Sequence, residues 1–193
     1  MGFDSLEFSD IFRRFTERAK REGEAAPTRL NEAEFHLIYN LYGAQLMKFC
    51  YCMMGNWGEA EEVTHDAFIK VFSGQWTHFP DKGLMYRLAT QACISQLRKR
   101  RHTDVGYLDD EVAENMASNE PGPEDEALID ERRVELARLI ARLPFQERTV
   151  MLLIWRGFTR GEIADILGID PRAVSSRRHR AYGKLRTWLD IEV

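Results

Sequence analysis

One stretch decides the predicted fold: residues 159–180 read TRGEIADILGIDPRAVSSRRHR. Apolar residues recur at helical spacing on either side of Gly168, which predicts two helices joined by a tight turn. Glycine suits this turn because such positions often need a positive φ, which residues with a Cβ avoid. Thr159 is placed to cap the first helix, with Glu162 completing a capping box, and the Asp-Pro pair at 170–171 suits the start of the second. The stretch therefore predicts a helix-turn-helix.

The second predicted helix of this motif carries charge of one sign. No acidic residue occurs between Pro171 and Thr187. Its basic and imidazole side chains are Arg172, Arg177, Arg178, His179, Arg180, Lys184 and Arg186. Such a helix can enter the major groove of DNA and reach phosphates and guanine edges. The alternative is an ordinary helical hairpin with a solvated basic face, and the motif alone leaves both open.

The rest of the chain also has helical periodicity, without the alternation typical of strands or the signal of a β-hairpin. We therefore expect an all-α fold, with two small helical domains joined by an acidic flexible linker and the helix-turn-helix in the C-terminal domain. The helices are expected at residues 3–20, 31–54, 60–72, 84–101, 134–143, 147–156, 159–167 and 171–188.

Charge and proline content locate the linker. Eleven acidic residues and no Lys or Arg occur between Asp104 and Glu131, and Pro-Gly-Pro stands at 121–123. The whole chain has a net charge of −4, yet residues 132–193 contain thirteen basic residues against seven acidic ones. This asymmetry is typical of two modules, one of which meets a polyanion. The expected divisions are an N-terminal helical extension at 1–30, a first domain at 31–102, the linker at 103–131 and a second domain at 132–193.

Composition and cysteine usage argue against several classes of protein. No run approaches the roughly 18 apolar residues of a membrane span, and the first residues lack a secretory pattern. Cys50, Cys52 and Cys93 are an odd number with one C-x-C pair, so we expect core packing in a reducing cytoplasm rather than disulfides. Redox sensing by Cys50 and Cys52 is the lesser alternative. His36 and His65 stand at no recognisable metal-ligand spacing, so no metal site is predicted.

The chain also lacks the usual marks of an enzyme. It contains no phosphate-binding glycine loop and no recognisable pairing of a nucleophile with a base. We therefore expect no catalytic activity, no cofactor and no small-molecule substrate.

Two longer sets of motifs cover most of the chain. The C-terminal set is LP at 143–144, ER at 147–148, GF at 157–158, EIA at 162–164, ILGI at 166–169, VSSR at 174–177 and HRA at 179–181, and the N-terminal set is EAEEV at 59–63, HDAF at 65–68 and the predicted helix at 84–101. In this order and spacing they resemble the extracytoplasmic-function (ECF) group of bacterial RNA polymerase sigma factors, domains 2 and 4. The resemblance implies an alternative sigma factor that binds core RNA polymerase, recognises −35 and −10 promoter elements, assists DNA melting and is controlled by an anti-sigma factor.

The resemblance assigns recognition of the −35 element to the second domain. The DNA-facing side of its last helix should lie opposite Val174, Ala181 and Leu185. Arginine and serine on that side can read bases, and the more peripheral cations can hold phosphates. The expected −35 contacts are Arg172, Ala173, Ser175, Ser176, Arg177, His179, Arg180 and Lys184.

The resemblance assigns the −10 element to the predicted helix at 84–101 and the loop before it. Opening a duplex requires capture of a single strand, in which aromatic rings stack on bases and basic side chains hold the backbone. The expected −10 contacts are Trp76, His78, Phe79, Lys82, Arg87, Gln91, Arg98, Lys99 and Arg101. Trp76 and Phe79 have the alternative role of core anchors, and residues 98–101 that of a solvated helix end.

Docking on core polymerase is expected to involve the predicted helix at 60–72 and its preceding turn. The candidates are Glu59, Glu62, Asp66 and Phe68. Solvated acids and a core phenylalanine are the alternative. The linker either occupies a basic polymerase channel or serves only as a tether that spaces the domains.

Several positions depart from the family pattern. Leu84, Gln91 and Ser95 stand where Trp, Asn and Asp are frequent, and Arg178 replaces an apolar residue. Arg178 is therefore expected either to extend from the core to solvent or to face a partner. Two alternatives for function stay open: a helix-turn-helix regulator that binds operator DNA, and a sigma-like decoy that titrates a partner.

Overall fold

The computed structural model describes Arg13, Glu17, residues 29–99 and residues 135–191. This part of the chain is all-α and holds no β-strand, which confirms the predicted fold class. Its helices are α2 (Glu32–Met54), α3 (Trp57–Ser73), α4 (Lys82–Lys99), a short helix at 135–141, α7 (Phe145–Trp155), α8 (Arg160–Leu167) and α9 (Pro171–Ile191). The predicted helix at 3–20, except for Arg13 and Glu17, and the linker at 103–131 lie outside the described residues.

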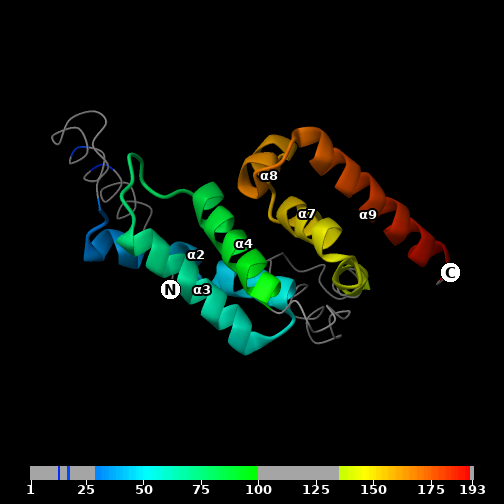
Figure 1. Cartoon of the computed structure of the whole chain (residues 1–193), viewed down its shortest axis with the longest axis horizontal. Helices are drawn as coiled ribbons and strands as arrows, with labels where there is room; N and C mark the ends of the chain where they lie inside the picture. Colours follow the sequence, from blue (N-terminus) through cyan, green and yellow to red (C-terminus); the bar gives the residue numbers. More distant parts are fainter. Residues whose placement is uncertain (1–12, 14–16, 18–28, 100–134, 192–193) are drawn as a thin grey trace, which may run out of the picture.

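Helices α2, α3 and α4 pack on one another, and we call them the first helical unit (Figure 1). Asn31 begins α2 with a capping box: its Oδ1 accepts the Glu34 N–H at 2.9 Å, while the Glu34 carboxylate accepts the Asn31 N–H at 2.8 Å. Gly55 ends α2 at a φ of 71°, a value that favours glycine. Asn56 caps α3, which therefore begins three residues earlier than predicted.

The core of the first helical unit is apolar and includes every cysteine of the chain. Phe49 and Tyr86 are buried with ring centroids 5.0 Å apart. The three thiols are free and buried, which agrees with the prediction of core packing. Burial raises the pKa of Cys52 to about 12, so this thiol stays protonated at neutral pH.

The helix at 135–141 and helices α7, α8 and α9 form the second helical unit (Figure 1). The Thr159 capping box with Glu162 is present, and Gly168 adopts a φ of 62° in the turn, both as predicted. The Asp170 carboxylate accepts the backbone N–H of Arg172 at 2.7 Å at the start of α9. Because the turn and caps take these geometries, α9 crosses α8 with Val174, Ala181 and Leu185 buried.

The two helical units pack against each other. Figure 1 shows α4 lying alongside α8, and α2 also contacts α7. Arg148 of α7 is buried at this junction, where its guanidinium donates to the Ala141 carbonyl at 3.0 Å and reaches the Met53 carbonyl at 3.5 Å. Burial lowers the pKa of Arg148 to about 10, which still leaves it charged at neutral pH.

None of the helices in the described residues combines the length and the apolar character needed to cross a membrane.

Replacing Thr159 by alanine tests the cap that orients α8. The variant loses the side-chain acceptor for the Glu162 N–H and one of the two donors to the Glu162 carboxylate, while the Thr159 backbone N–H remains. We expect the free energy of unfolding to fall by about 1 kcal/mol, measured by urea denaturation. Thr187→Ala is the control, because this exposed hydroxyl bonds only to the Gly183 carbonyl within α9 and should matter by less than about 0.5 kcal/mol. Equal losses of unfolding free energy in the two variants would contradict the stabilising role of the Thr159 cap.

Candidate nucleic-acid interface

The exposed side of α9 presents basic and polar residues to solvent. Arg172, Ser176 and His179 are all exposed, and they lie on the opposite side of the helix from buried Val174 and Ala181. The hydroxyl of Ser176 donates to the Arg172 carbonyl at 3.0 Å, which leaves its oxygen lone pairs facing outward as acceptors. This side of α9 therefore has the shape and charge for a DNA groove.

Other predicted −35 residues are divided between neighbouring surfaces. Ala173 and Ser175 are half-buried, and the Ser175 hydroxyl donates to the Pro171 carbonyl at 3.2 Å. Arg178, which is not among the predicted −35 contacts, is exposed on a different side of α9, so it faces solvent or a partner and does not enter the core. The predicted set therefore does not form one continuous face.

Glu147 of α7 holds two of the predicted −35 cations. Its carboxylate is 8% exposed and accepts from Arg180 Nε and Lys184 Nζ, each at 3.1 Å. Two cations share one anion, so this cluster keeps a net positive charge. Glu147 thereby positions both side chains along α7, a role that the sequence analysis did not assign to it.

Arg177 lies at the junction of the two helical units. It lines a groove of about 380 Å³ together with Arg98 and Leu97 of α4 and Phe145 of α7. A residue expected to contact the −35 element and one expected to contact the −10 element are thus brought to the same groove. Arg177 is half-buried here, so access of DNA to its side chain depends on how the units are placed.

Lys82 of α4 is held by the second helical unit. Its Nζ donates to the Arg156 carbonyl at 2.6 Å and lies 4.8 Å from the ring centroid of Phe158. The Phe158 ring in turn packs edge to face on Tyr86 of α4, with centroids 5.1 Å apart. Arg156 is the C-cap of α7, so the cation lies at the negative end of that helix.

Arg87 makes the equivalent contact with α8. Its Nε and one terminal nitrogen donate to the Asp165 carbonyl at 3.1 and 2.6 Å. Asp165 belongs to the last turn of α8, where carbonyl oxygens lack partners within the helix. Two cations expected to hold the DNA backbone therefore hold helix-end carbonyls instead.

The loop before α4 places its aromatic residues in or near the core. Phe79 is only 9% exposed, and the indole of Trp76 is half-buried and donates to the Val71 carbonyl at 2.8 Å. In this arrangement both rings have the core-anchor role, which the sequence analysis gave as the alternative. His78 is exposed beside Thr77, with Nδ1 and Oγ1 3.0 Å apart.

The remaining −10 candidates lie further along α4. Gln91, Arg98 and Lys99 are exposed, and Arg101 lies outside the described residues. Helix α4 therefore keeps polar and basic groups accessible toward its C-terminal half, whereas Lys82 and Arg87 in its first half contact the second unit.

The predicted polymerase-docking residues lie along α3. Glu62 and Asp66 are exposed, and Glu62 accepts from the side-chain amide of Gln96 at 3.1 Å. Glu59 is half-buried in the first turn of α3. Phe68 is buried and packs on Tyr39 with ring centroids 5.0 Å apart, as expected for its alternative role in the core.

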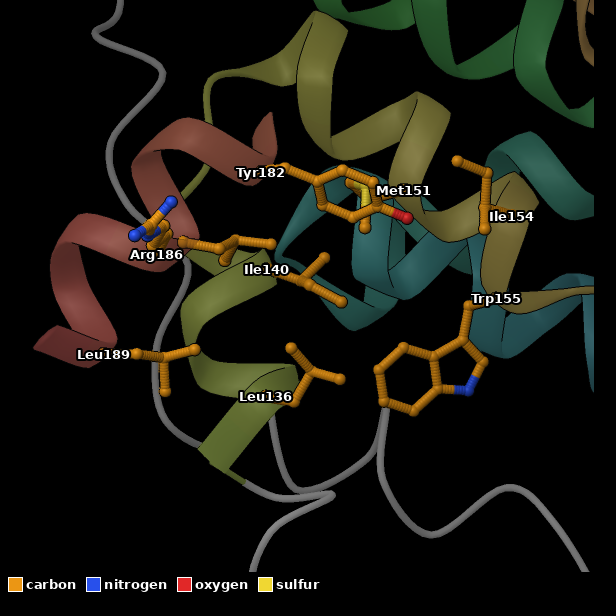
Figure 2. Close-up of a pocket in the computed structure, with 9 residues that line it drawn as sticks. Leu136, Ile140, Met151, Ile154, Trp155, Tyr182, Arg186 and Leu189 are labelled. Carbon is orange, nitrogen blue, oxygen red and sulfur yellow. The ribbon is translucent and has the colours of Figure 1, made fainter. Parts of the chain in front are cut away.

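The second helical unit also has an apolar groove that the sequence analysis missed. Figure 2 shows Leu136 and Ile140 of the helix at 135–141 facing Leu189 and Tyr182 of α9, with Met151 and Trp155 of α7 at its side. The groove encloses about 480 Å³, and Leu136, Tyr182 and Leu189 are exposed. Sequence periodicity could not reveal it, because an exposed apolar residue at helical spacing has the pattern of a core residue.

No group of three or more His, Cys, Asp or Glu side chains among the described residues is arranged to hold a metal ion.

Comparison with known families matches both helical units. The family "Sigma-70 region 2" matches residues 38–103, and "Sigma-70, region 4" matches residues 133–185. The first match spans α3, α4 and most of α2, and the second includes the helix-turn-helix.

Curated relatives match most of the chain. The ECF RNA polymerase sigma factor SigW of Bacillus subtilis is 30% identical over 164 residues, which cover 79% of this chain and 87% of that protein. The RNA polymerase sigma factor CarQ of Myxococcus xanthus is 28% identical, covering 80% of this chain and 88% of that protein.

Two solved structures have a similar fold. A structure of CnrH in complex with the cytosolic domain of CnrY gives a TM-score of 0.58 at 18% identity, over 94% of this chain and 99% of that chain. The sigma factor RpoE in complex with the anti-sigma factor NepR, from Bartonella quintana, gives 0.57 at 19% identity, over 82% of this chain and 98% of that chain.

Removing both α4 cations tests their role in holding the helical units together. We expect Lys82→Ala/Arg87→Ala to separate the units, because the ends of α7 and α8 lose these charged donors, each worth about 1 kcal/mol at sites that are only partly buried or exposed. The radius of gyration from small-angle X-ray scattering should increase. Lys48→Ala/Lys70→Ala makes the same change of charge on α2 and α3 and should leave the radius unchanged. An unchanged radius in both variants would refute the role of Lys82 and Arg87 in holding the two helical units together.

Proposed function

The chain belongs to the ECF group of RNA polymerase sigma factors, and we propose that its two helical units divide promoter recognition between them. A sigma factor binds core RNA polymerase and directs it to promoters, so the chain acts in transcription initiation. In this division the first domain (31–102) serves polymerase docking and the −10 element, and the second domain (132–193) serves the −35 element.

For the −35 element, the proposal rests on the outward side of α9. Arg172, Ser176 and His179 are exposed on a helix that has no acid up to Thr187, and the helix is held at its start by the Gly168 turn. Arg172 and Ser176 are suited to base edges, and His179 to a phosphate. Arg180 and Lys184, which Glu147 positions, supply further positive charge beside the DNA groove that α9 would enter.

For the −10 element, we assign Gln91, Arg98 and Lys99 of α4, joined by Lys82 and Arg87 once these leave the second unit. The support is that charged donors bonded to carbonyl oxygens can exchange these acceptors for phosphate oxygens, which are stronger partners. Full use of both cations by promoter DNA therefore requires the two units to separate, since Lys82 and Arg87 give their hydrogen bonds to Arg156 and Asp165 in the packed arrangement.

For polymerase docking, we assign the exposed acids Glu62 and Asp66 of α3. They project from one side of a helix whose other side is held in the core by Val63 and Ala67. An acidic helix face of this kind suits a basic partner helix, for which charge complementarity aids recognition.

We further propose that an anti-sigma factor controls the chain and that it acts in the cytoplasm as a non-catalytic initiation factor. The support is the similarity to RpoE, whose structure was solved with the anti-sigma factor NepR. The exposed apolar groove beside Tyr182 and Leu189 offers one surface where an amphipathic helix of such a protein could bind.

Run-off transcription with purified core polymerase tests the assignment of α9. We expect Arg172→Ala to reduce −35-dependent transcript about 10-fold, because a lost bidentate base contact costs about 1–3 kcal/mol. Arg178→Ala is the matched control, since it removes an exposed arginine from another side of the same helix. Binding to core polymerase should be unchanged in both. Equal activity of the two variants would contradict this DNA-facing side, and core binding without any transcript from the native chain would favour a decoy.

A further inference from the structure

A second groove, lined by both apolar and polar residues, lies on the first helical unit between α2 and α3. It encloses about 620 Å³, with Tyr39 and Met47 on the α2 side and Trp57 and Phe68 on the α3 side. Tyr39 is 53% exposed and Trp57 is 51% exposed, so the described residues leave large aromatic surfaces uncovered here. Monomeric proteins rarely leave contiguous apolar surface open unless something binds it.

The apolar surface continues beyond the groove toward the beginning of α2. Phe72 packs against Phe35 with ring centroids 5.0 Å apart, yet Phe72 and the neighbouring Ile69 remain 49% exposed. Exposed apolar side chains therefore recur along the α2–α3 pair from Trp57 to Phe72, with Glu61 and His65 between them. The length of this stretch suits an amphipathic helix better than a single inserted side chain.

The rim of the groove is acidic. Glu61 and Glu62 line it beside His65, and Asp66 follows on the same helix. Over its whole length α3 has four acidic residues and one lysine. An occupant should therefore combine apolar side chains for the groove with positive charge for the rim.

Residues 8–21 of this chain have that combination. Phe8, Ile11, Phe12 and Phe15 recur at the spacing of one helix face, and the segment holds five basic residues against two acidic ones. Arg13 is helical and exposed, as is Glu17 one helical turn later, at positions opposite the apolar face. The function proposed above does not use this segment.

The connection to α2 is long enough for the segment to reach the groove. The eight residues at 22–29 can span up to about 26–29 Å when extended. Tyr39 lies seven residues into α2 and Met47 fifteen, which correspond to about 10 and 22 Å along the helix. Both ends of the groove are therefore within reach of residues 8–21.

We propose that residues 8–21 form an amphipathic helix that docks into the α2–α3 groove, with its phenylalanines on Tyr39, Trp57 and Phe68 and with Arg14 and Arg18, which flank the apolar face, toward Glu61 and Glu62. The chain then covers its own groove. Glu62 also belongs to the polymerase-docking surface proposed above, so the segment would compete with core polymerase. That consequence, unlike the docking itself, rests on the proposed function.

Hydroxyl-radical footprinting of the full chain, read by mass spectrometry, tests the docking without polymerase. In Phe12→Ser/Phe15→Ser, labelling of Tyr39 and Trp57 should rise about fivefold, since both side chains pass from covered to roughly half exposed. Asp10→Ser/Arg13→Ser is the matched control, because it alters the opposite side of the segment without changing net charge. Trp155 of the second unit serves as an internal reference.

Equal labelling of Tyr39 and Trp57 in the native chain and both variants would overturn the docking, and the groove would then be open to a partner. The consequence for polymerase is read separately, as the affinity of the same variants for core polymerase. Higher labelling in the phenylalanine variant with unchanged core affinity would keep the docking and refute the competition. A similar rise in the control variant would refute the assigned helix face.

Discussion

The arrangement of this protein depends on two cations of α4 that bind the carbonyl ends of two helices. Lys82 donates to the C-cap of α7 and Arg87 to the last turn of α8, so each neutralises part of a helix dipole. These contacts, with the Tyr86–Phe158 ring pair, set how the second helical unit lies on the first. They also determine which promoter-reading groups are accessible, because the same cations are the ones suited to phosphates. In the proposed function, protein carbonyls and promoter DNA compete for these two donors.

The packing of the units is suited to opening. The hydrogen bonds that Lys82 and Arg87 make to the second unit lie at partly buried or exposed sites, where such contacts contribute little individually. Arg148 adds a buried charge that donates to the carbonyl oxygens of Ala141 and Met53, and its Nε has no hydrogen-bond partner within the described part of the chain. Such a group contributes less than a paired ion would and carries a desolvation cost. A modest gain in binding energy from polymerase and promoter can therefore offset the loss of the contacts between the units.

The sequence predicted the local structure well because caps and turns are local. The Thr159 capping box, the Gly168 turn and the helix end at Gly55 each follow from residues adjacent in the sequence, and the structure confirms them. The placement of charged side chains could not be predicted, because it depends on neighbours distant in sequence. Glu147 redirects Arg180 and Lys184 from another helix, and Arg87 bonds to a carbonyl 78 residues away. The exposure of aromatic side chains such as Tyr39 could not be predicted either, since periodicity does not distinguish an exposed apolar face from a core face.

Energy transfer between dyes on α3 and α9 would test most directly whether the units separate for function. The labels belong on exposed positions such as Lys70 and Arg178, replaced by cysteine, because the three native thiols are buried. We expect efficient transfer in the free protein and a clear loss of transfer in a transcribing complex with core polymerase and promoter DNA. Unchanged transfer in an active complex would contradict this expectation, because Lys82 and Arg87 would then still be bound to α7 and α8 while the promoter is open.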